Sequence, residues 1–593
     1  MYETIASLVA RHQGYEDVAA TIQGVYARIE KHADPALLIT LRPKEATLAA
    51  AQILSAAGRE GKPLFGVPFF VKDNIDVAGL PTTAACPAFA YTPEKSAFVV
   101  AKLEAAGAIV IGKTNLDQFA TGLVGVRSPY GAPRNAVRAD LIPGGSSSGS
   151  ATAVGAGIVP FSLGTDTAGS GRVPAALNGI VGLKPTLGTL SASGVVPACR
   201  TLDTISIFAG CVEDAFAVFA AAAGYDSADP YSRPWAEPTM TGYAPHLPIG
   251  VPRRDQRAFF GDSAAERAYE ADLAGLTSAG FALVEFDFAP FAETARLLYE
   301  GPWVAERYAA TKAIIENRPD AMHPVTRAII EGARKFDAVS AFEAQYRLAA
   351  LKRQTEAAWR GFHAMAVPTM PRAYTLAEVA ADPIATNARL GTYTNFVNLL
   401  DLCAIAYPSG VRADGLPSSV TLIAPGGGDG RIAALAARMH ADSGAPIGAT
   451  GAMAPSAPPV GEHPRHVRIA VVGAHLSGLP LNGQLRDLDA EFVREARTRA
   501  DYKLFALPDT TPPKPGLLRV GKGDGAKIAV EIWSLSPAAF GAFVAAIPSP
   551  LGIGALFFDD GASAQGFLVE AEAVKGAEDI SRFGGWRAYL AAR

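Results

Sequence analysis

The sequence predicts an α/β protein followed by a smaller α+β domain. Up to residue 443, short apolar runs with the character of buried strands alternate with helical patterns, which is typical of layered α/β folds. Residues 444–466 are rich in Gly, Ala and Pro and have no periodicity, which indicates a linker. Strand-like and helix-like stretches then resume. We therefore expect domains at 1–443 and 467–593, joined by a linker at 444–466.

Local patterns predict the elements of each domain. In the first domain we expect helices at 15–33, 264–279, 340–359 and 431–441, strands at 67–71, 362–369 and 418–425, and a helix followed by a strand within 98–111. In the second domain we expect strands at 468–474, 527–533, 555–561 and 566–574, with helices at 487–498 and 538–546.

Charge and cysteine content exclude several classes of protein. Lys and Arg number 53 against 57 Asp and Glu, so the slightly acidic chain is unlike a nucleic-acid binder. The N-terminus lacks a leader pattern, and no apolar run is long enough to span a membrane, so we expect a cytoplasmic protein. Wide cysteine spacing disfavours a disulfide framework or a zinc site; the four are Cys86, Cys199, Cys211 and Cys403.

Two serines in glycine-rich turns, together with an upstream lysine, form the candidate catalytic group. Ser146 and Ser170 lie in the turns, and Lys72 follows an apolar run that predicts a buried strand. A lysine can act as a base only when it is neutral, and burial lowers a lysine pKa toward that condition. We expect Ser146 to relay a proton from the nucleophile Ser170 to Lys72.

The run around Ser170 is suited to hold an oxyanion. Glycine-rich sequence lets backbone N–H groups curl toward one point, and such donors stabilise charge that develops in the transition state. We expect this oxyanion hole from the amides of Thr167, Ala168, Gly169 and Ser170. Asp166 and Arg172 flank the run and are expected to buttress it.

These segments, FFVKDNID, GGSSSG and TDTAGSGR, resemble the amidase signature family. Position by position, the resemblance makes Lys72, Ser146 and Ser170 a Ser-cisSer-Lys triad that hydrolyses a carbon–nitrogen amide bond without metal or organic cofactor. It also implies a mixed central sheet covered by helices. Ser148 and Ala168 stand where glycine is usual in the family. Both replacements are small. Because oxyanion donors are backbone amides, Ala168 is expected to affect the local backbone angles more than the activity.

Three further segments resemble the allophanate hydrolases within this family: residues 117–131, residues 299–308 and the motif VVGAHLSGLPLN. The substrate implied is a small anion, a urea whose nitrogen carries a carboxylate. Arginine reads a planar carboxylate by paired hydrogen bonds. The resemblance assigns this task to Arg307 with Tyr299, and a backbone contact to Gly122. It also implies a role in urea or triazine degradation, with a functional link to a urea carboxylase or a biuret hydrolase. The large linked architecture favours a homodimer.

The second domain resembles the allophanate hydrolase C-terminal domain, whose fold is similar to the γ-glutamylcyclotransferase-like fold. His475 is the one ionisable side chain of an apolar, glycine-rich loop, with Asn482 nearby in sequence. Two interpretations stay open. His475 is an acid/base group that promotes decarboxylation of N-carboxycarbamate, or it is a structural histidine in a domain that stabilises the enzyme.

Other functions remain to be weighed against this expectation. The first alternative is another amidase, including the tRNA-dependent amidotransferase component that amidates misacylated tRNA. That component needs RNA contact, which the acidic charge and the Tyr299/Arg307 pair disfavour. The second alternative is a catalytically inactive scaffold, which the complete triad disfavours.

Overall fold

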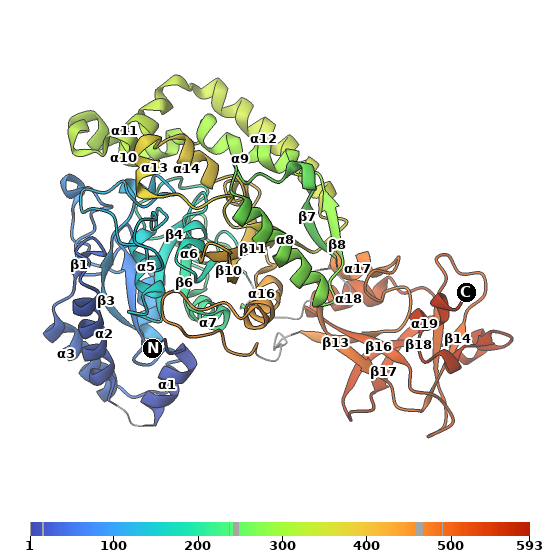
Figure 1. The fold of residues 1–593 in the computed structure, drawn as a ribbon. Coiled ribbons are helices and arrows are strands. Elements are labelled where there is room, and N and C mark those ends of the chain that lie inside the picture. The colour runs from blue at the N-terminus through green and yellow to red at the C-terminus, as the bar shows by residue number, and fades with distance from the viewer. Residues whose placement is uncertain (1, 15–16, 236–237, 241–247, 458–465, 489) are drawn as a thin grey trace. The chain divides into compact units, whose positions relative to one another are not determined.

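The computed structural model describes residues 2–14, 17–235, 238–240, 248–457, 466–488 and 490–593. The chain divides into two compact units, one formed by residues 1–238 and 248–458, the other by residues 239–247 and 459–593 (Figure 1). No helix among the described residues is long and apolar enough to cross a membrane.

Within the described residues, the first unit is built on an eleven-stranded mixed sheet (Figure 1). The α/β class expected from the sequence is therefore confirmed. In sheet order the strands are β1 (Leu38–Leu41), β3 (Ile109–Thr114), β2 (Pro68–Lys72), β4 (Phe161–Asp166), β6 (Thr204–Ala209), β5 (Val181–Lys184), β10 (Leu402–Val411), β11 (Pro417–Pro425), β9 (Ala364–Pro368), β7 (Ile249–Pro252) and β8 (Leu283–Phe286).

Helices cover this sheet, and those expected from the sequence at 15–33, 98–105, 264–279, 340–359 and 431–441 are present. Their bounds are α1 (Ile5–Gln13), α2 (Val18–His32), α3 (Lys44–Ala56), α4 (Phe98–Ala105), α5 (Ser148–Gly155), α6 (Val173–Leu177), α7 (Val212–Ala222), α8 (Ser263–Ser278), α9 (Ala289–Glu300), α10 (Val304–Asn317), α11 (Pro324–Glu331), α12 (Ala338–Ala358), α13 (Leu376–Ala381), α14 (Ala385–Leu390), α15 (Phe396–Leu399) and α16 (Asp429–Ser443).

The central strands β2 and β4 position the candidate catalytic group. Both strands are completely buried, and Phe69 stacks on Phe161 with ring centroids 4.9 Å apart. The strands run parallel, so their carboxyl ends lie at the same edge of the sheet. Lys72 ends β2 and Asp166 ends β4, which brings the lysine and the second serine-containing loop to one edge.

Part of the segment expected to be a linker packs on the first unit. Ile447 is fully buried in a core cluster, and the amide of Gly448 donates to the Gly179 carbonyl over 2.7 Å. An isolated bridge joins Pro446 to Met453. Burial of the Ile447 side chain explains why a Gly- and Pro-rich stretch is ordered here. The later part of the expected linker, residues 458–465, lies outside the described residues.

The second unit is rich in β-structure and carries few helices (Figure 1). Its described residues form a five-stranded sheet of β13 (Glu491–Arg497), β16 (Ala529–Leu535), β12 (Val467–Val471), β18 (Ser563–Val569) and β17 (Leu551–Phe557), and a three-stranded sheet of β15 (Pro515–Arg519), β14 (Tyr502–Ala506) and β19 (Glu578–Asp579). The helices are α17 (Asn482–Arg486), α18 (Pro537–Ala545) and α19 (Trp586–Ala591).

The helix expected at 487–498 is wrong. The chain forms strand β13 there, antiparallel to β16, with Phe492 opposite Trp533 at 5.6 Å between ring centroids. Ala, Glu and Arg favour a helix locally, but this cross-strand aromatic pair and the ladder hydrogen bonds outweigh that preference. The expected helix at 538–546 is confirmed by α18.

Candidate active site

Lys72 is buried at the end of β2 and contacts two hydroxyl groups. Its Nζ lies 2.8 Å from Ser146 Oγ and 2.7 Å from Thr165 Oγ1. Burial lowers the pKa of Lys72 to about 7, against the opposing effect of the carboxylates of Asp117 and Asp203. A substantial fraction of Lys72 is therefore neutral near pH 7, as a base must be.

The Ser146 turn is held in place by its neighbour Asp117. The Gly145–Ser146 peptide bond is cis, and the Ser146 carbonyl accepts from the Asp117 amide over 3.0 Å. The Asp117 carboxylate in turn accepts from the amides of Gly125 and Arg127, each over 2.9 Å. A Cβ at position 145 would lie only 2.0 Å from Asp117 Oδ2, so the close approach requires glycine.

Ser148, which stands where the family has glycine, is accommodated without strain. It begins α5, and its hydroxyl donates to the Asn115 carbonyl over 3.3 Å. This departure from the family pattern adds one buried hydrogen bond.

A buried ion pair holds the Ser170 loop. The Asp166 carboxylate accepts from the amides of Gly169 and Gly171, over 2.9 and 3.0 Å, and from two nitrogens of Arg172, both at 2.9 Å. Burial alone would raise the pKa of Asp166, but the Arg172 guanidinium and these hydrogen bonds lower it below its ordinary value. Asp166 thus stays ionised and keeps the loop in one conformation.

Ser170 lies beside Gly122 and is nearly buried, with 3% of its surface exposed. Its hydroxyl lies 3.5 Å from the Gly122 carbonyl. Within the part of the chain that the structure describes, no hydrogen bond joins Ser170 to Ser146. The structure therefore brings Lys72 and Ser146 together and leaves the link to Ser170 open, as is common before substrate binds.

The amides expected to form an oxyanion hole are not equivalent. Gly169 donates its N–H to Asp166, whereas those of Thr167, Ala168 and Ser170 have no hydrogen-bond partner among the described residues. Gly169 has φ +133°, and a Cβ there would meet Thr394 Oγ1 at 2.4 Å. The Ala168 methyl is buried in a cluster that includes the apolar side chains of Cys199, Leu202, Leu298 and Leu399. Alanine at this position therefore adds apolar packing.

The buried Arg307 and the half-buried Tyr299 form a pair next to the Gly122 segment. The guanidinium lies over the Tyr299 ring, 5.3 Å from its centroid, and donates to the Thr121 hydroxyl over 3.1 Å. Burial alone would lower the pKa of Arg307, but the Tyr299 and Cys199 groups around it raise the pKa above its ordinary value. Arg307 Nε is buried without a hydrogen-bond partner. A fixed cation with an unused donor is suited to a carboxylate ligand.

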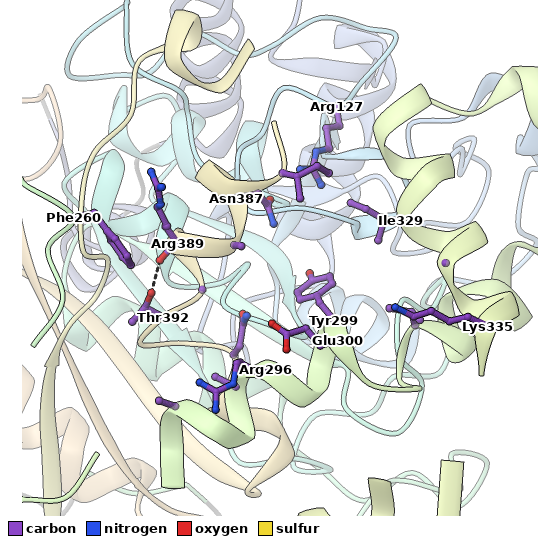
Figure 2. A pocket seen from close by; sticks show the side chains of 18 residues that line it. Arg127, Phe260, Arg296, Tyr299, Glu300, Ile329, Lys335, Asn387, Arg389 and Thr392 are labelled. Atoms are coloured by element: carbon purple, nitrogen blue, oxygen red, sulfur yellow. Dashed lines mark hydrogen bonds between the residues drawn. The ribbon is translucent and has the colours of Figure 1, made fainter. Parts of the chain in front are cut away.

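A cavity of about 570 Å³ adjoins this pair (Figure 2). Tyr299 and Arg127 both line it. Arg127 donates to the Thr121 carbonyl over 3.0 Å, so the cavity wall reaches the segment that contacts Ser170.

Sequence reasoning missed Thr165, Asp117 and Arg127. Asp117 and Arg127 fall inside the 117–131 segment, but nothing in their spacing distinguishes them from surface residues.

His475 of the second unit lines a separate cavity of about 290 Å³. Its ring stacks on Phe567 at 5.2 Å and meets Phe543 edge-on, while Nε2 lies 2.9 Å from Gln484 Oε1. Asn482 donates to the His475 carbonyl over 3.0 Å. Burial lowers the pKa of His475, so the imidazole is neutral at pH 7.

Glu531 is a further buried group that sequence reasoning missed. Its carboxylate accepts from the amide and the hydroxyl of Ser477, both over 2.8 Å, and pairs with Arg587 at 2.8 Å. These bonds fix the loop that carries His475. The signal was the single acidic residue in the strand-like segment KIAVEIW.

Comparison with known proteins decides the family. The family model described as Amidase matches residues 20–432. This chain belongs to the amidase family. The model described as Allophanate hydrolase C-terminal domain matches residues 467–591 of the same chain. This amidase therefore carries an allophanate hydrolase C-terminal domain, and its class is amidohydrolase.

The similar proteins cover this amidase to different extents. A solved structure of Kluyveromyces lactis allophanate hydrolase is 41% identical, with a TM-score of 0.80, over 100% of this chain and 99% of that one. Urea amidolyase of Saccharomyces cerevisiae is 44% identical over 93% of this chain, but the chain spans only 31% of that relative's length. A glutamyl-tRNA(Gln) amidotransferase component of Symbiobacterium thermophilum is 36% identical over 62% of this chain and 81% of its own.

Proposed function

We propose that this amidase hydrolyses allophanate, the urea-1-carboxylate anion, through an acyl-enzyme on Ser170. The observation that carries the proposal is the buried Arg307, a fixed cation that bonds to Thr121, the residue before the Gly122 whose carbonyl lies against Ser170. A neutral amide would offer this cation no anionic partner. The full-length similarity to an allophanate hydrolase supports the same substrate.

In the proposed reaction, Ser170 Oγ attacks the terminal amide carbon of allophanate. Its proton passes through the Ser146 hydroxyl to the neutral amine of Lys72, which already lies 2.8 Å from Ser146. The free amides of Thr167, Ala168 and Ser170 stabilise the developing oxyanion. Collapse of the tetrahedral intermediate breaks the C–N bond, and the same proton returns to the leaving nitrogen as ammonia departs.

The second half of the cycle repeats these steps with water. Water attacks the acyl-enzyme while Lys72 again accepts a proton through Ser146, and Ser170 leaves with that proton. The product is N-carboxycarbamate. Arg307 and Tyr299 hold the substrate carboxylate throughout, so the amide carbon stays aligned with Ser170.

One assay tests this function against its alternatives. Purified protein alone should release ammonia from allophanate much faster than from simple amides. Ammonia release only from glutamine in the presence of charged tRNA and partner subunits would indicate an amidotransferase instead. Inactivity toward all of these substrates would indicate a scaffold.

Replacing Arg307 should selectively harm the anionic substrate. With Arg307→Met, kcat/KM for allophanate should fall roughly one to two decades, because a charge-assisted contact is typically worth about 1.5 to 3 kcal/mol. Arg307→Lys should recover part of this loss, since it keeps the charge without the paired donors. Hydrolysis of the uncharged malonamide serves as the control. If malonamide suffers as much as allophanate in both variants, Arg307 has a structural role only.

We also propose that the second unit promotes decarboxylation of N-carboxycarbamate. Its cavity combines His475 with the Lys514 ammonium, and this cation suits a product that carries two carboxylates. The neutral His475 imidazole can accept a proton and return it during the reaction. The alternative is that His475 has a structural role only, and the experiment below distinguishes the two roles.

His475→Ala in the full chain should leave the first ammonia unchanged and delay carbon dioxide and the second ammonia. Rapid mixing with separate detection of carbon dioxide and ammonia measures both steps. Asn482→Ala is the matched control, because the Asn482 side chain bonds the His475 carbonyl and carries no acid/base group. Superimposable time courses for wild type and His475→Ala would leave His475 a structural residue.

The source of the substrate, the oligomeric state and the cellular compartment also belong to the proposed function. We propose a functional link to a urea carboxylase or a biuret hydrolase that delivers allophanate, and the similarity to urea amidolyases supports the link to urea. We further propose a homodimer in the cytoplasm. Sedimentation of the purified protein tests the dimer, and fractionation of cells tests the compartment.

A further inference from the structure

The cavity beside Tyr299 is rich in cations that have no carboxylate partner. Arg296, Lys335 and Arg389 line it, and none of the three forms an ion pair within the described part of the chain. They come from α9, from the short 3-10 helix η5 (Gly332–Lys335) and from α14 (Figure 2). Arg389 lies over the Phe260 ring at 5.3 Å, and Lys335 lies over the Phe336 ring at 4.8 Å.

Charge balance makes the cavity positive. Arg127 is a fourth cation in the lining, and Glu300 is the one carboxylate among the described lining residues. Surface cations in proteins are usually interspersed with carboxylates, so three unpaired cations around one hollow give a field of one sign. Arg296 and Lys335 are exposed and Arg389 is half-buried, so dissolved salt can screen this field.

Two residues of the cavity wall contact groups of the candidate active site. Tyr299, in its wall, lies over the Arg307 guanidinium. Asn387, also in its wall, accepts from the amide of Leu123 over 2.7 Å, next to the Gly122 carbonyl that Ser170 contacts. Volumes of roughly 300–1,000 Å³ suit drug-sized ligands, so about 570 Å³ exceeds what a substrate of urea size needs for direct contact.

We propose that this cavity is an anion-collecting antechamber, in which Arg296, Lys335 and Arg389 attract the substrate carboxylate before Arg307 binds it. The inference rests on the proposed function. The three cations act through their field, and their contribution to KM therefore depends on ionic strength. The Debye length is about 30 Å at 0.01 M salt and about 3 Å at 1 M, so the attraction should disappear at high salt.

The test neutralises the three cations together, as Arg296→Gln, Lys335→Gln and Arg389→Gln in one chain. At about 0.01 M salt, KM for allophanate should rise about five-fold, and at about 1 M salt the difference from wild type should shrink below about two-fold. The kcat for allophanate and the KM for malonamide should both equal the wild-type values. The matched control is Lys31→Gln, Lys95→Gln and Arg267→Gln, three exposed cations outside the cavity lining that change net charge equally.

The outcomes separate this inference from the proposed function. A salt-independent KM for allophanate, an equal rise for malonamide, or an equal rise in the control variant would overturn the antechamber while leaving the function intact. Wild-type protein that hydrolyses malonamide but not allophanate would overturn the proposed function itself, and the antechamber with it. A rise confined to allophanate, to low salt and to the cavity variant supports both.

Discussion

Replacing Ser170 by alanine is expected to lower ammonia release from allophanate by roughly 10⁴- to 10⁶-fold in kcat, since a nucleophilic serine acts as one unit with its base. The fold should survive, because among the described residues the Ser170 hydroxyl makes only the long 3.5 Å contact to the Gly122 carbonyl. Ammonia measured in samples quenched at fixed times gives the decrease in kcat, and thermal unfolding checks that the variant is folded.

The chain offers a matched control in Ser148. This serine is also buried, at the start of α5, and its hydroxyl donates to the Asn115 carbonyl. Ser148→Ala should retain near-wild-type turnover. Substantial activity in Ser170→Ala, or an equal loss in Ser148→Ala, would show that the nucleophile has been assigned to the wrong serine.

Loss of the Lys72 amine is expected to have the second largest effect. Lys72→Met keeps the length and apolar stem of the side chain but removes the base, so kcat should fall about 10²- to 10⁴-fold. Ser146→Ala breaks the same proton route. Because the members act together, the Lys72→Met and Ser146→Ala double variant should be little worse than either single change.

The pH profile gives this prediction a second, independent readout. The pKa of Lys72 is lowered by burial to about 7, and only the neutral amine accepts a proton. Activity should therefore rise with pH through about 7 and level off above it. Lys184 is the control lysine, because it is fully buried, with a pKa lowered to about 8, but donates only to the carbonyls of Pro185 and Leu402. Lys184→Met should reduce stability yet keep the midpoint of the profile, and a shifted midpoint would point to Lys184 as the titrating base.

The candidate site residues that could be predicted from the sequence are those that lie within short motifs. Lys72, Ser146 and the Asp166/Arg172 pair can be recognised in the sequence because each stands at a fixed position of a short motif. The two serine motifs are also rich in glycine. In the structure, Lys72 Nζ lies 2.8 Å from Ser146 Oγ. Thr165 could not be found in this way, because it contacts Lys72 only through the pairing of two strands that are distant in sequence.

Long-range pairing also explains the errors in the fold. Residues 487–498 carry a helical composition, and only the partner strand β16, with Trp533 opposite Phe492, makes a strand of them. Ile447 looked like part of a linker because its burial depends on core residues far away in sequence. The cations Arg296, Lys335 and Arg389 are likewise unremarkable one by one. Only tertiary packing gathers them around one cavity.

Trapping the acyl-enzyme tests the central claim most directly. Allophanate labelled at the amide carbonyl carbon is mixed with the full chain, quenched in acid within the first turnover, and the peptides are mapped by mass spectrometry. We predict label on the peptide that carries Ser170, release of the first ammonia in the same burst, and no label in Ser170→Ala. Label on another residue, or full turnover without any covalent species in wild type, would contradict the assignment of Ser170 as the nucleophile.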